Sequence, residues 1–188
     1  MILCTLEIRV LFNYHLIMKI WAKFIDDQYE KREITHTRTT VRAVLLNEHN
    51  EIALIKVKGN DIFGIRDYYE LPGGGKKRKE TLLEALRREI IEEVGCSIKD
   101  IEEIGRVIDF YNLINRKNDN HYYLAKIDRN ITPPSLEDYE KEIFQEIIFV
   151  PIHKAIEMYK TKLNTPLGKL VGQRELVILN KVSTQQLK

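Results

Sequence analysis

The chain has 188 residues and a mass of 22.2 kDa, enough for one domain with a buried core. Hydrophobic residues make up 44% and charged residues 31%, which excludes disordered and fibrous proteins, and no stretch is a typical membrane span. The 30 basic and 28 acidic side chains leave a net charge of +2, so bulk charge does not indicate a nucleic-acid partner. Two cysteines, Cys4 and Cys96, are too few for a disulfide framework, which favours a reducing cytoplasm.

Residues 1–37 are predicted to form a strand extension ahead of the main domain, residues 38–188. Apolar and polar residues alternate over 6–12, and 19–25 can pair with them as a second strand. Because an isolated two-stranded ribbon is marginally stable in water, it must pack on the domain's own sheet or on a second copy of the chain. Of the two arrangements we expect the second, a homodimer. A different interpretation takes Met18 as the natural start.

The elements that follow are mostly strands, with a helix in the middle and two near the end. Strands are predicted over 41–46, 52–57, 67–71, 104–113, 122–127 and 147–150, and helices over 81–94, 153–160 and 168–182. The polar run 47–51 is typical of a hairpin turn, and the polar run 115–120 is predicted to be a second turn. This order predicts a mixed sheet covered by helices.

Three carboxylates fall on one stripe of the helix predicted over 81–94: Glu89, Glu92 and Glu93. Such close like charges destabilise a helix unless a positive group lies among them, and Mg²⁺ prefers oxygen ligands. The glycine run 73–75 ahead of the helix adds backbone groups that can bind metal or phosphate. The alternative interpretation is an ordinary solvated acidic face with Arg87 and Arg88 as local partners.

The pattern of fixed residues resembles the Nudix box. Its positions are Gly74, Glu80, Arg88-Glu89, Ile90, Glu92-Glu93, Gly95 and Cys96, approached through Tyr69-Glu70-Leu71-Pro72-Gly73. The resemblance implies an α/β/α sandwich around a mixed sheet. It also implies a hydrolase that uses Mg²⁺ or Mn²⁺ to cleave a diphosphate in a nucleoside di- or triphosphate or a related nucleotide derivative.

The resemblance further implies roles for single residues. Glu89, Glu92, Glu93 and the Gly73 carbonyl would hold the metal, and Arg88, with Glu80, would orient the clustered glutamates. Either a box glutamate (Glu89 or Glu92) or a glutamate of a later loop would take a proton from the attacking water. The later candidates are Glu137, Glu140, Glu142 and Glu146, and among them Glu142 is favoured.

Two basic features leave alternatives open. Arg42 resembles a position that faces the substrate's phosphates or base, but an arginine that points outward from a strand can equally face solvent. The run Lys76–Lys79 either attracts polyanions, such as RNA ends or inositol polyphosphates, or is a solvated loop. Two other functions compete: a nucleotide-sensing, non-catalytic Nudix module and an isopentenyl-diphosphate isomerase. The intact glutamates favour hydrolysis.

Overall fold

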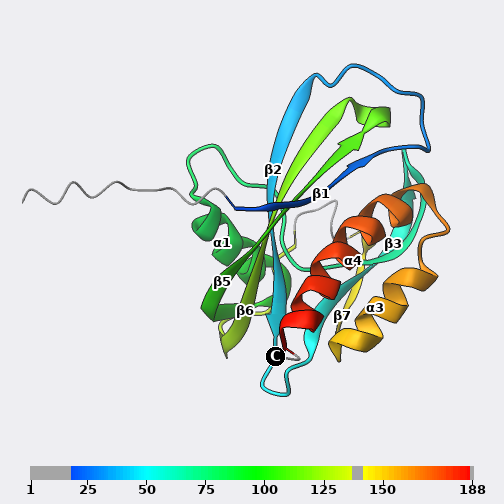
Figure 1. Ribbon diagram of the computed structural model, residues 1–188. Coiled ribbons are helices and arrows are strands. Elements are labelled where there is room, and N and C mark those ends of the chain that lie inside the picture. The colour runs from blue at the N-terminus through cyan, green and yellow to red at the C-terminus, as the bar shows by residue number, and fades with distance from the viewer. Residues whose placement is uncertain (1–17, 137–141, 187–188) are drawn as a thin grey trace, which may run out of the picture.

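One mixed sheet organises the residues that this computed structural model describes, 18–136 and 142–186 (Figure 1). Its seven strands follow the order β1-β5-β6-β2-β3-β4, and β7 pairs with β3. The strands are β1 (Ile20–Ile25), β2 (His36–Leu46), β3 (Ile52–Asp61), β4 (Gly64–Glu70), β5 (Cys96–Tyr111), β6 (Arg116–Asn130) and β7 (Phe144–Val150). The helices are α1 (Leu82–Val94), α3 (Ile152–Thr161) and α4 (Pro166–Gln186), with a 3₁₀ turn, η1 (Asn112–Ile114).

The helices cover both faces of the sheet. Helix α1 contacts β2 and β5, whereas α4 contacts β1, β4 and β5, with α3 packed beside it (Figure 1). The pairs β1–β5 and β2–β6 are parallel and the other strand pairs are antiparallel. This arrangement confirms the α/β/α sandwich with a mixed sheet. No helix among the described residues is long and apolar enough to cross a membrane.

Helix α1 begins and ends where its local sequence directs. Thr81 accepts a hydrogen bond from the Glu84 backbone N–H, and the Glu84 side chain accepts one from the Thr81 N–H, which makes a capping box. Gly95 ends the helix in the left-handed conformation, with φ of 77°. The apolar side of α1, Ala85, Leu86 and Ile90, is fully buried against the sheet.

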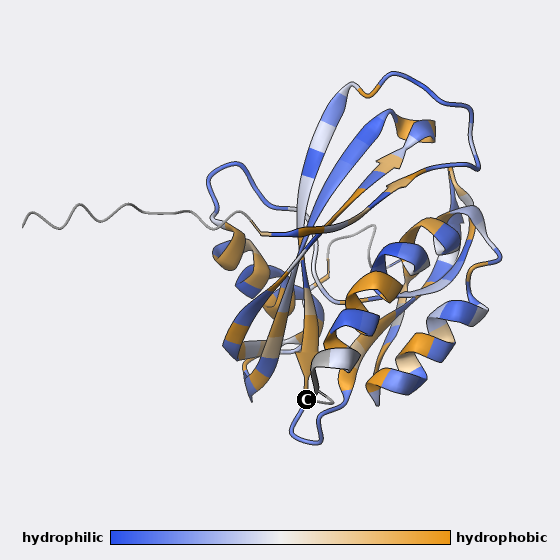
Figure 2. Ribbon diagram, viewed as in Figure 1, coloured by the Kyte–Doolittle hydropathy of each residue, from blue (hydrophilic) through white to orange (hydrophobic). Residues whose placement is uncertain are grey.

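The strands change character along their length. Figure 2 shows the lower part of β2 largely in the hydrophobic colour, and the upper parts of β2 and β6 in white and blue, towards the hydrophilic end of the scale. The apolar parts supply two buried clusters, one beneath α1 and one beneath α3 and α4. The polar parts line a hollow that is described with the site below.

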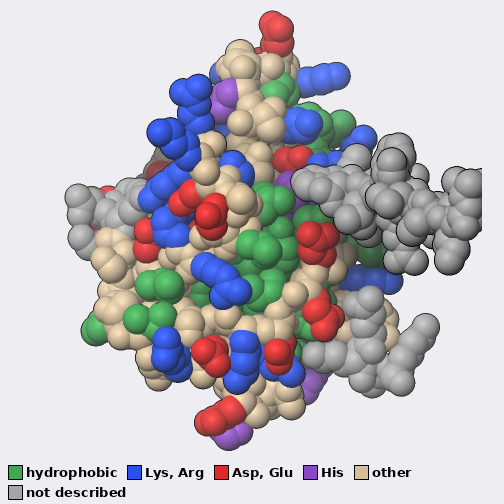
Figure 3. All heavy atoms as spheres, turned by 90° about the vertical axis from the view of Figure 1, so that its left-hand side faces the viewer, with side chains coloured by type: hydrophobic (Ala, Val, Ile, Leu, Met, Phe, Trp, Pro, Cys, Tyr) green, Lys and Arg blue, Asp and Glu red, His purple; other side chains and the backbone are tan. Residues whose placement is uncertain are grey.

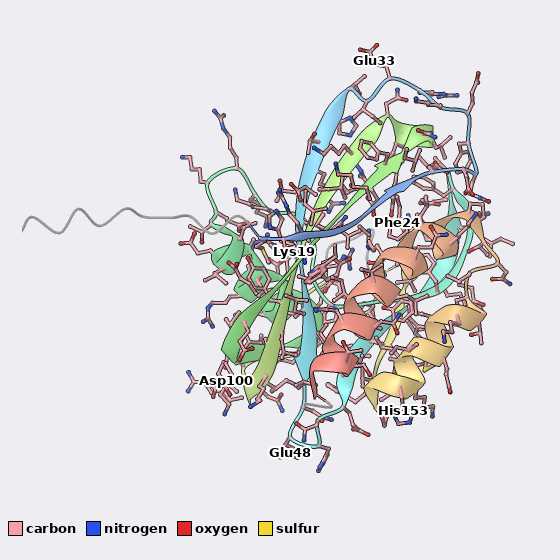
Figure 4. The ribbon with its side chains drawn as sticks, viewed as in Figure 1. Lys19, Phe24, Glu33, Glu48, Asp100 and His153 are labelled. Atoms are coloured by element: carbon pink, nitrogen blue, oxygen red, sulfur yellow. The ribbon has the colours of Figure 1, made fainter. Side chains whose placement is uncertain are left out.

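Strand β1 joins the sheet of its own chain. It lies parallel to β5, with Ile20 opposite Arg106, and the Trp21 indole Nε1 donates to the Ile104 carbonyl at 2.8 Å. Figure 4 labels Lys19 and Phe24 near the two ends of this strand. For β1 the chain therefore adopts the intramolecular arrangement, whereas the strand predicted over 6–12 lies outside the described residues. The homodimer stays a prediction.

One predicted turn is wrong. Of the run 115–120, only Asn115 belongs to the turn, and β6 begins at Arg116. The polar side chains are satisfied by neighbouring strands: Asn118 donates to Asp109 at 2.6 Å, and Thr40 donates to Asn120 at 2.8 Å. Because these partners are far away in sequence, local composition alone indicated a loop.

Candidate active site

The acidic stripe of α1 lies against the glycine turn that precedes the helix. Glu89 is 6% exposed, and its carboxylate approaches Gly74 so closely that a Cβ added there would displace it. The turn itself is fixed to β2, because the N–H groups of Val41 and Ala43 donate to the carbonyls of Gly74 and Pro72, both at 2.9 Å. Neither bond uses the Gly73 carbonyl oxygen that lies between them.

Arg88 holds three of the carboxylates together. Its Nη1 donates to Glu89 and Glu92, each at 2.8 Å, and its Nε and Nη2 donate to Glu80 at 2.5 and 3.0 Å. Nη2 also donates to the Gly75 carbonyl at 3.0 Å, which ties the helix to the turn. The hydrogen bonds from Arg88, followed by one from the Lys77 N–H, lower the pKa of Glu80 to about 2. Arg88 thus makes the contacts expected of a residue that orients the clustered glutamates together with Glu80.

Glu93 has a different partner from its two neighbours. Its carboxylate accepts a hydrogen bond from the Gly73 N–H at 2.6 Å, and both residues line the adjacent pocket. Gly73 has φ of 134°, and a Cβ there would collide with the Val41 carbonyl. The glycine is therefore needed both for its backbone conformation and for its contact with β2.

The donor atoms at this position fit a hard divalent cation. Only oxygen is offered: the carboxylates of Glu89, Glu92 and Glu93 and the Gly73 carbonyl. Among the described residues, no three acidic, histidine or cysteine side chains converge as a ready-made cage, because Arg88 and the Gly73 N–H each hold part of the set. Mg²⁺ needs no such cage, since it typically binds one or two carboxylates and keeps water and phosphate as its other ligands.

Beside the stripe lies a pocket of about 410 Å³. Its walls come from β2, β3, β4, β6, α4 and the glycine turn, so it joins the box to the polar upper part of the sheet. Charged and polar lining residues are Arg38, Thr40, Arg42, Arg66, Glu70, Glu93, Arg116, Asn118, Asn120 and Arg174. Apolar side chains, among them Phe63, Phe144 and Val171, cover the rest. The pocket thus combines a hydrogen-bonding wall with an apolar one.

Arg42 does not face solvent, so the second of its two interpretations is wrong. It is 8% exposed, donates to the Leu71 carbonyl at 2.7 Å and forms an ion pair with Glu70 at 2.9 Å. Burial raises the pKa of Glu70, but the charges of Arg42 and Arg174 outweigh it and hold that pKa at about 2. Arg42 lines the pocket as a fixed, charged group.

The later glutamates are less closely placed. Glu142 is exposed, and it precedes Ile143 and Phe144, which line the pocket. Glu146 forms an ion pair with Lys56 at 3.2 Å. Glu137 and Glu140 lie outside the described residues. The structure thus brings Glu89, Glu92, Glu93, Gly73 and Arg42 to one region. Glu142 is next to pocket residues in the sequence, but it does not itself line the pocket.

Sequence reasoning missed Arg174 of α4. It is 4% exposed, lines the pocket and bonds weakly to Asp109, Tyr111 and Asn120 at 3.3 to 3.5 Å. Its neighbour Glu175 is fully buried, and burial, only partly offset by Arg174 and Arg42, raises the pKa of its carboxyl. The signal was present: Arg174 lies midway between Leu170 and Ile178, on the buried stripe of α4.

A second, shallow hollow lies where the basic run meets the start of β2 and β6. It is lined by His36, Thr37, Arg38, Thr39, Lys76, Lys77, Arg78 and Arg116. Arg38 and Arg116 line both hollows, so the two are adjacent. Figure 3, which views the side of the molecule that carries α1, shows Lys and Arg side chains gathered on its upper part. Lys76, Lys77 and Arg78 of the basic run therefore line a hollow that shares two arginines with the pocket.

Comparisons with known proteins agree on one family. A model of the NUDIX domain matches residues 36–171. An RNA pyrophosphohydrolase of Coxiella burnetii is 38% identical over 85 residues, which are 45% of this chain and 34% of that protein, so the match spans about a third of the relative's length.

Solved structures show the same fold. A NUDIX hydrolase from Nitrosomonas europaea has a TM-score of 0.59 at 14% identity, covering 81% of this chain and 90% of its own. The MutT protein from Methanosarcina mazei has a TM-score of 0.57 at 18% identity, covering 85% and 99%. The NUDIX domain of NrtR from Shewanella oneidensis, solved with ADP ribose, has a TM-score of 0.57 at 16% identity, covering 85% and 94%.

Proposed function

This chain belongs to the NUDIX domain family, and we propose that it cleaves the diphosphate of a nucleotide with Mg²⁺ as cofactor. Members of this family hydrolyse pyrophosphate bonds and typically depend on a divalent metal. The observation that carries this proposal is the position of Glu89, Glu92 and Glu93 beside a pocket lined by arginines. Acidic side chains for a cation and basic side chains for phosphates lie next to each other there.

The chain's own residues divide the work of binding and orientation. Glu89, Glu92, Glu93 and the Gly73 carbonyl would hold the metal, which when bound offsets phosphate charge and lowers the pKa of water. Arg88 fixes the positions of the Glu89 and Glu92 carboxylates through hydrogen bonds of 2.8 Å to each. Arg38 and Arg116, at the junction of the two hollows, can contact the phosphates. Arg42 would bind the substrate from within the pocket.

Proton transfer from the attacking water needs a carboxylate with a free oxygen lone pair. Glu92 is more open to water than Glu89, with side chains 30% and 8% exposed, and Glu142 is the favoured residue of the later loop. A pH profile of kcat for Glu142→Gln separates the two. If Glu142 is the base, the acidic limb of the profile disappears; if Glu92 is the base, that limb is unchanged.

The substrate is a nucleotide with at least two linked phosphates, either free or at the end of an RNA chain. The relative named RNA pyrophosphohydrolase supports the second form, and the basic hollow beside the pocket supports a substrate with additional negative charge. A purified-protein assay for released phosphate or pyrophosphate would compare nucleoside di- and triphosphates, ADP-ribose and 5′-triphosphorylated RNA with Mg²⁺. Tight binding of a nucleotide without any cleavage would instead support the nucleotide-sensing function.

A further inference from the structure

Asn118 carries a buried acceptor that no described residue satisfies. The residue is 2% exposed and lines the pocket, yet its Oδ1 receives no hydrogen bond within the described part of the chain. A buried polar atom without a partner costs roughly 1–3 kcal/mol, so such an atom on a residue that lines a pocket points to a ligand that supplies the missing donor.

The orientation of this amide is fixed by its other end. Asn118 Nδ2 donates to Asp109 Oδ1 at 2.6 Å, and a carboxylate can only accept, so Nδ2 is held there and Oδ1 is turned away. Asp109 is fully buried and uses its second oxygen to accept from Arg174 Nη1 at 3.4 Å. One carboxylate therefore positions two neighbouring pocket groups, an acceptor on Asn118 and a cationic donor on Arg174.

The neighbouring amide offers no such acceptor. Asn120, two residues along β6, donates to the Val107 carbonyl at 3.0 Å and accepts from Thr40 at 2.8 Å. Asn118 thus differs from Asn120 in having an amide oxygen that accepts no hydrogen bond from a described residue, although both residues line the polar wall.

The charge distribution indicates which part of a nucleotide meets Asn118. Arg38 and Arg116 form no ion pair with a described carboxylate, and burial followed by the charge of Arg38 lowers the pKa of Arg116. Such arginines suit phosphates. Arg174, by contrast, is balanced by Asp109 and Glu175, and Asn118 Oδ1 would repel a phosphate oxygen. The part of the pocket around Asn118 and Arg174 therefore suits an uncharged planar group with its own N–H better than a phosphate. Phe63 and Val171 would be the apolar contacts of such a group.

We infer that Asn118 is a specificity-determining residue: its Oδ1 accepts a hydrogen bond from an N–H group on the edge of the substrate's nucleobase, while Arg174 donates to a neighbouring acceptor on that edge. The inference rests on the proposed function and adds the recognition of the base to it. It requires a nucleobase edge on which a donor and an acceptor are neighbours, as on adenine, guanine and uracil.

The test compares the best nucleotide with an analogue that lacks the N–H. The pairs are adenosine with purine riboside, guanosine with inosine (which lacks the N2–H) and with 1-methylguanosine (which lacks the N1–H), and uridine with 3-methyluridine, each as the same phosphate ester. For guanosine, the values count as equal only if neither analogue differs from it. The natural nucleotide should have a kcat/KM about 10- to 100-fold higher in the wild type, because the analogue leaves Oδ1 unsatisfied. Equal values for both members of the pair would overturn the inference.

Variants assign that preference to Asn118. In Asn118→Leu the two members of the pair should become equal, whereas Asn130→Leu, the same change at the exposed far end of β6, should keep the preference. A preference that survives Asn118→Leu would overturn the inference. If that variant does not fold, Asn118→Ser, whose hydroxyl is too short to replace Oδ1, is used with the same expectation.

Failure of the inference and failure of the proposed function give different results. If no diphosphate is cleaved, the proposed function fails, but calorimetric Kd values for the same nucleotide pairs still report whether Asn118 discriminates between them. If cleavage occurs without discrimination, only the inference fails.

Discussion

The guanidinium of Arg88 contacts both carboxylate oxygens of Glu80, with Nε to Oε1 at 2.5 Å and Nη2 to Oε2 at 3.0 Å. This two-point contact joins the loop before α1 to the acidic stripe of the helix, because the same guanidinium also bonds Glu89 and Glu92. Glu80 is therefore linked to Glu89 and Glu92 through Arg88 without lying on the stripe.

Replacing Glu80 with glutamine should weaken metal binding more than folding. The variant loses one charged partner of Arg88, so the guanidinium is drawn further onto Glu89 and Glu92 and competes with the cation. We expect the Mg²⁺ concentration for half-maximal rate to rise about 10-fold. Glu48→Gln, in the exposed turn between β2 and β3, is the matched control. An unchanged Mg²⁺ dependence would contradict this role of Glu80.

Replacing Glu93 with glutamine should abolish metal-dependent turnover while the fold stays intact. The amide oxygen can still accept from the Gly73 N–H, now 2.6 Å from the carboxylate, so the turn keeps its contact. The charge that a cation needs is lost, and kcat at limiting Mg²⁺ should fall by at least about 100-fold. Thermal melting checks the fold, with Glu157→Gln on α3 as the control. Wild-type kcat at limiting Mg²⁺ would remove Glu93 from the site.

Charge reversal at Arg78 and Lys79 should affect long polyanions selectively. The run 76–79 contributes three of its four residues to the shallow hollow beside the pocket, so a favourable field there would raise kcat/KM for 5′-triphosphorylated RNA but not for a mononucleotide. The effect should shrink as salt rises, because the Debye length falls from about 10 Å at 0.1 M to about 3 Å at 1 M. The paired reversal of Lys154 and Lys160 on α3 makes the same change in net charge elsewhere. A salt-independent loss would mean that the loop is distorted or contacts the substrate directly.

The Arg42–Glu70 ion pair should make folding sensitive to acid. Because the pKa of Glu70 is about 2 in the folded protein, against 4.5 ordinarily, folding favours its ionised form. Its stabilisation is complete above about pH 4.5 and is lost as the pH falls towards 2. Between pH 6 and 3 the free energy of unfolding should fall by on the order of 2 kcal/mol from this group, and by less in Glu70→Gln. Urea denaturation from pH 6 to 3 measures it, with the exposed Glu102→Gln as the control.

Truncations distinguish the two parts of the N-terminal segment. Removing residues 1–37 deletes β1, with the Trp21–Ile104 bond and the Lys19–Arg106 backbone bond, and should lower the melting temperature strongly. Removing residues 1–17 leaves β1 in place. If the homodimer is held by residues 6–12, the shorter truncation should convert it to a monomer in light scattering at tens of micromolar. A full-length chain that is already monomeric would refute the dimer.

The interactions that fix α1 and its box are local, which is why the helix could be predicted from the sequence. The capping pair Thr81 and Glu84, the terminal Gly95 and the 3.6-residue spacing of apolar positions all act within a few residues of one another. The grouping of Glu89, Glu92 and Glu93 follows from helix geometry alone, and the turn 47–51 was predicted because Asn47 caps it through its own neighbours.

The pocket was less predictable, because its polar residues are stabilised by partners far away in sequence. Local composition predicts a turn at Asn118 and Asn120. Their place in a strand depends on hydrogen bonds to Asp109, Val107 and Thr40, which the local sequence does not reveal. Arg174 depends on Asp109, 65 positions earlier. The sequence contains these residues, but no spacing rule relates a helix near the C-terminus to two strands in the middle of the chain.

The parallel pairing of β1 with β5 has a consequence for synthesis. Ile20 is opposite Arg106, so a nascent chain exposes Trp21 and Phe24 until more than eighty further residues have left the ribosome. Contacts that close such a long loop form late in folding. During this interval an apolar strand with unpaired backbone groups is available to chaperones or to another nascent chain, and its docking marks the point at which that edge of the sheet is complete.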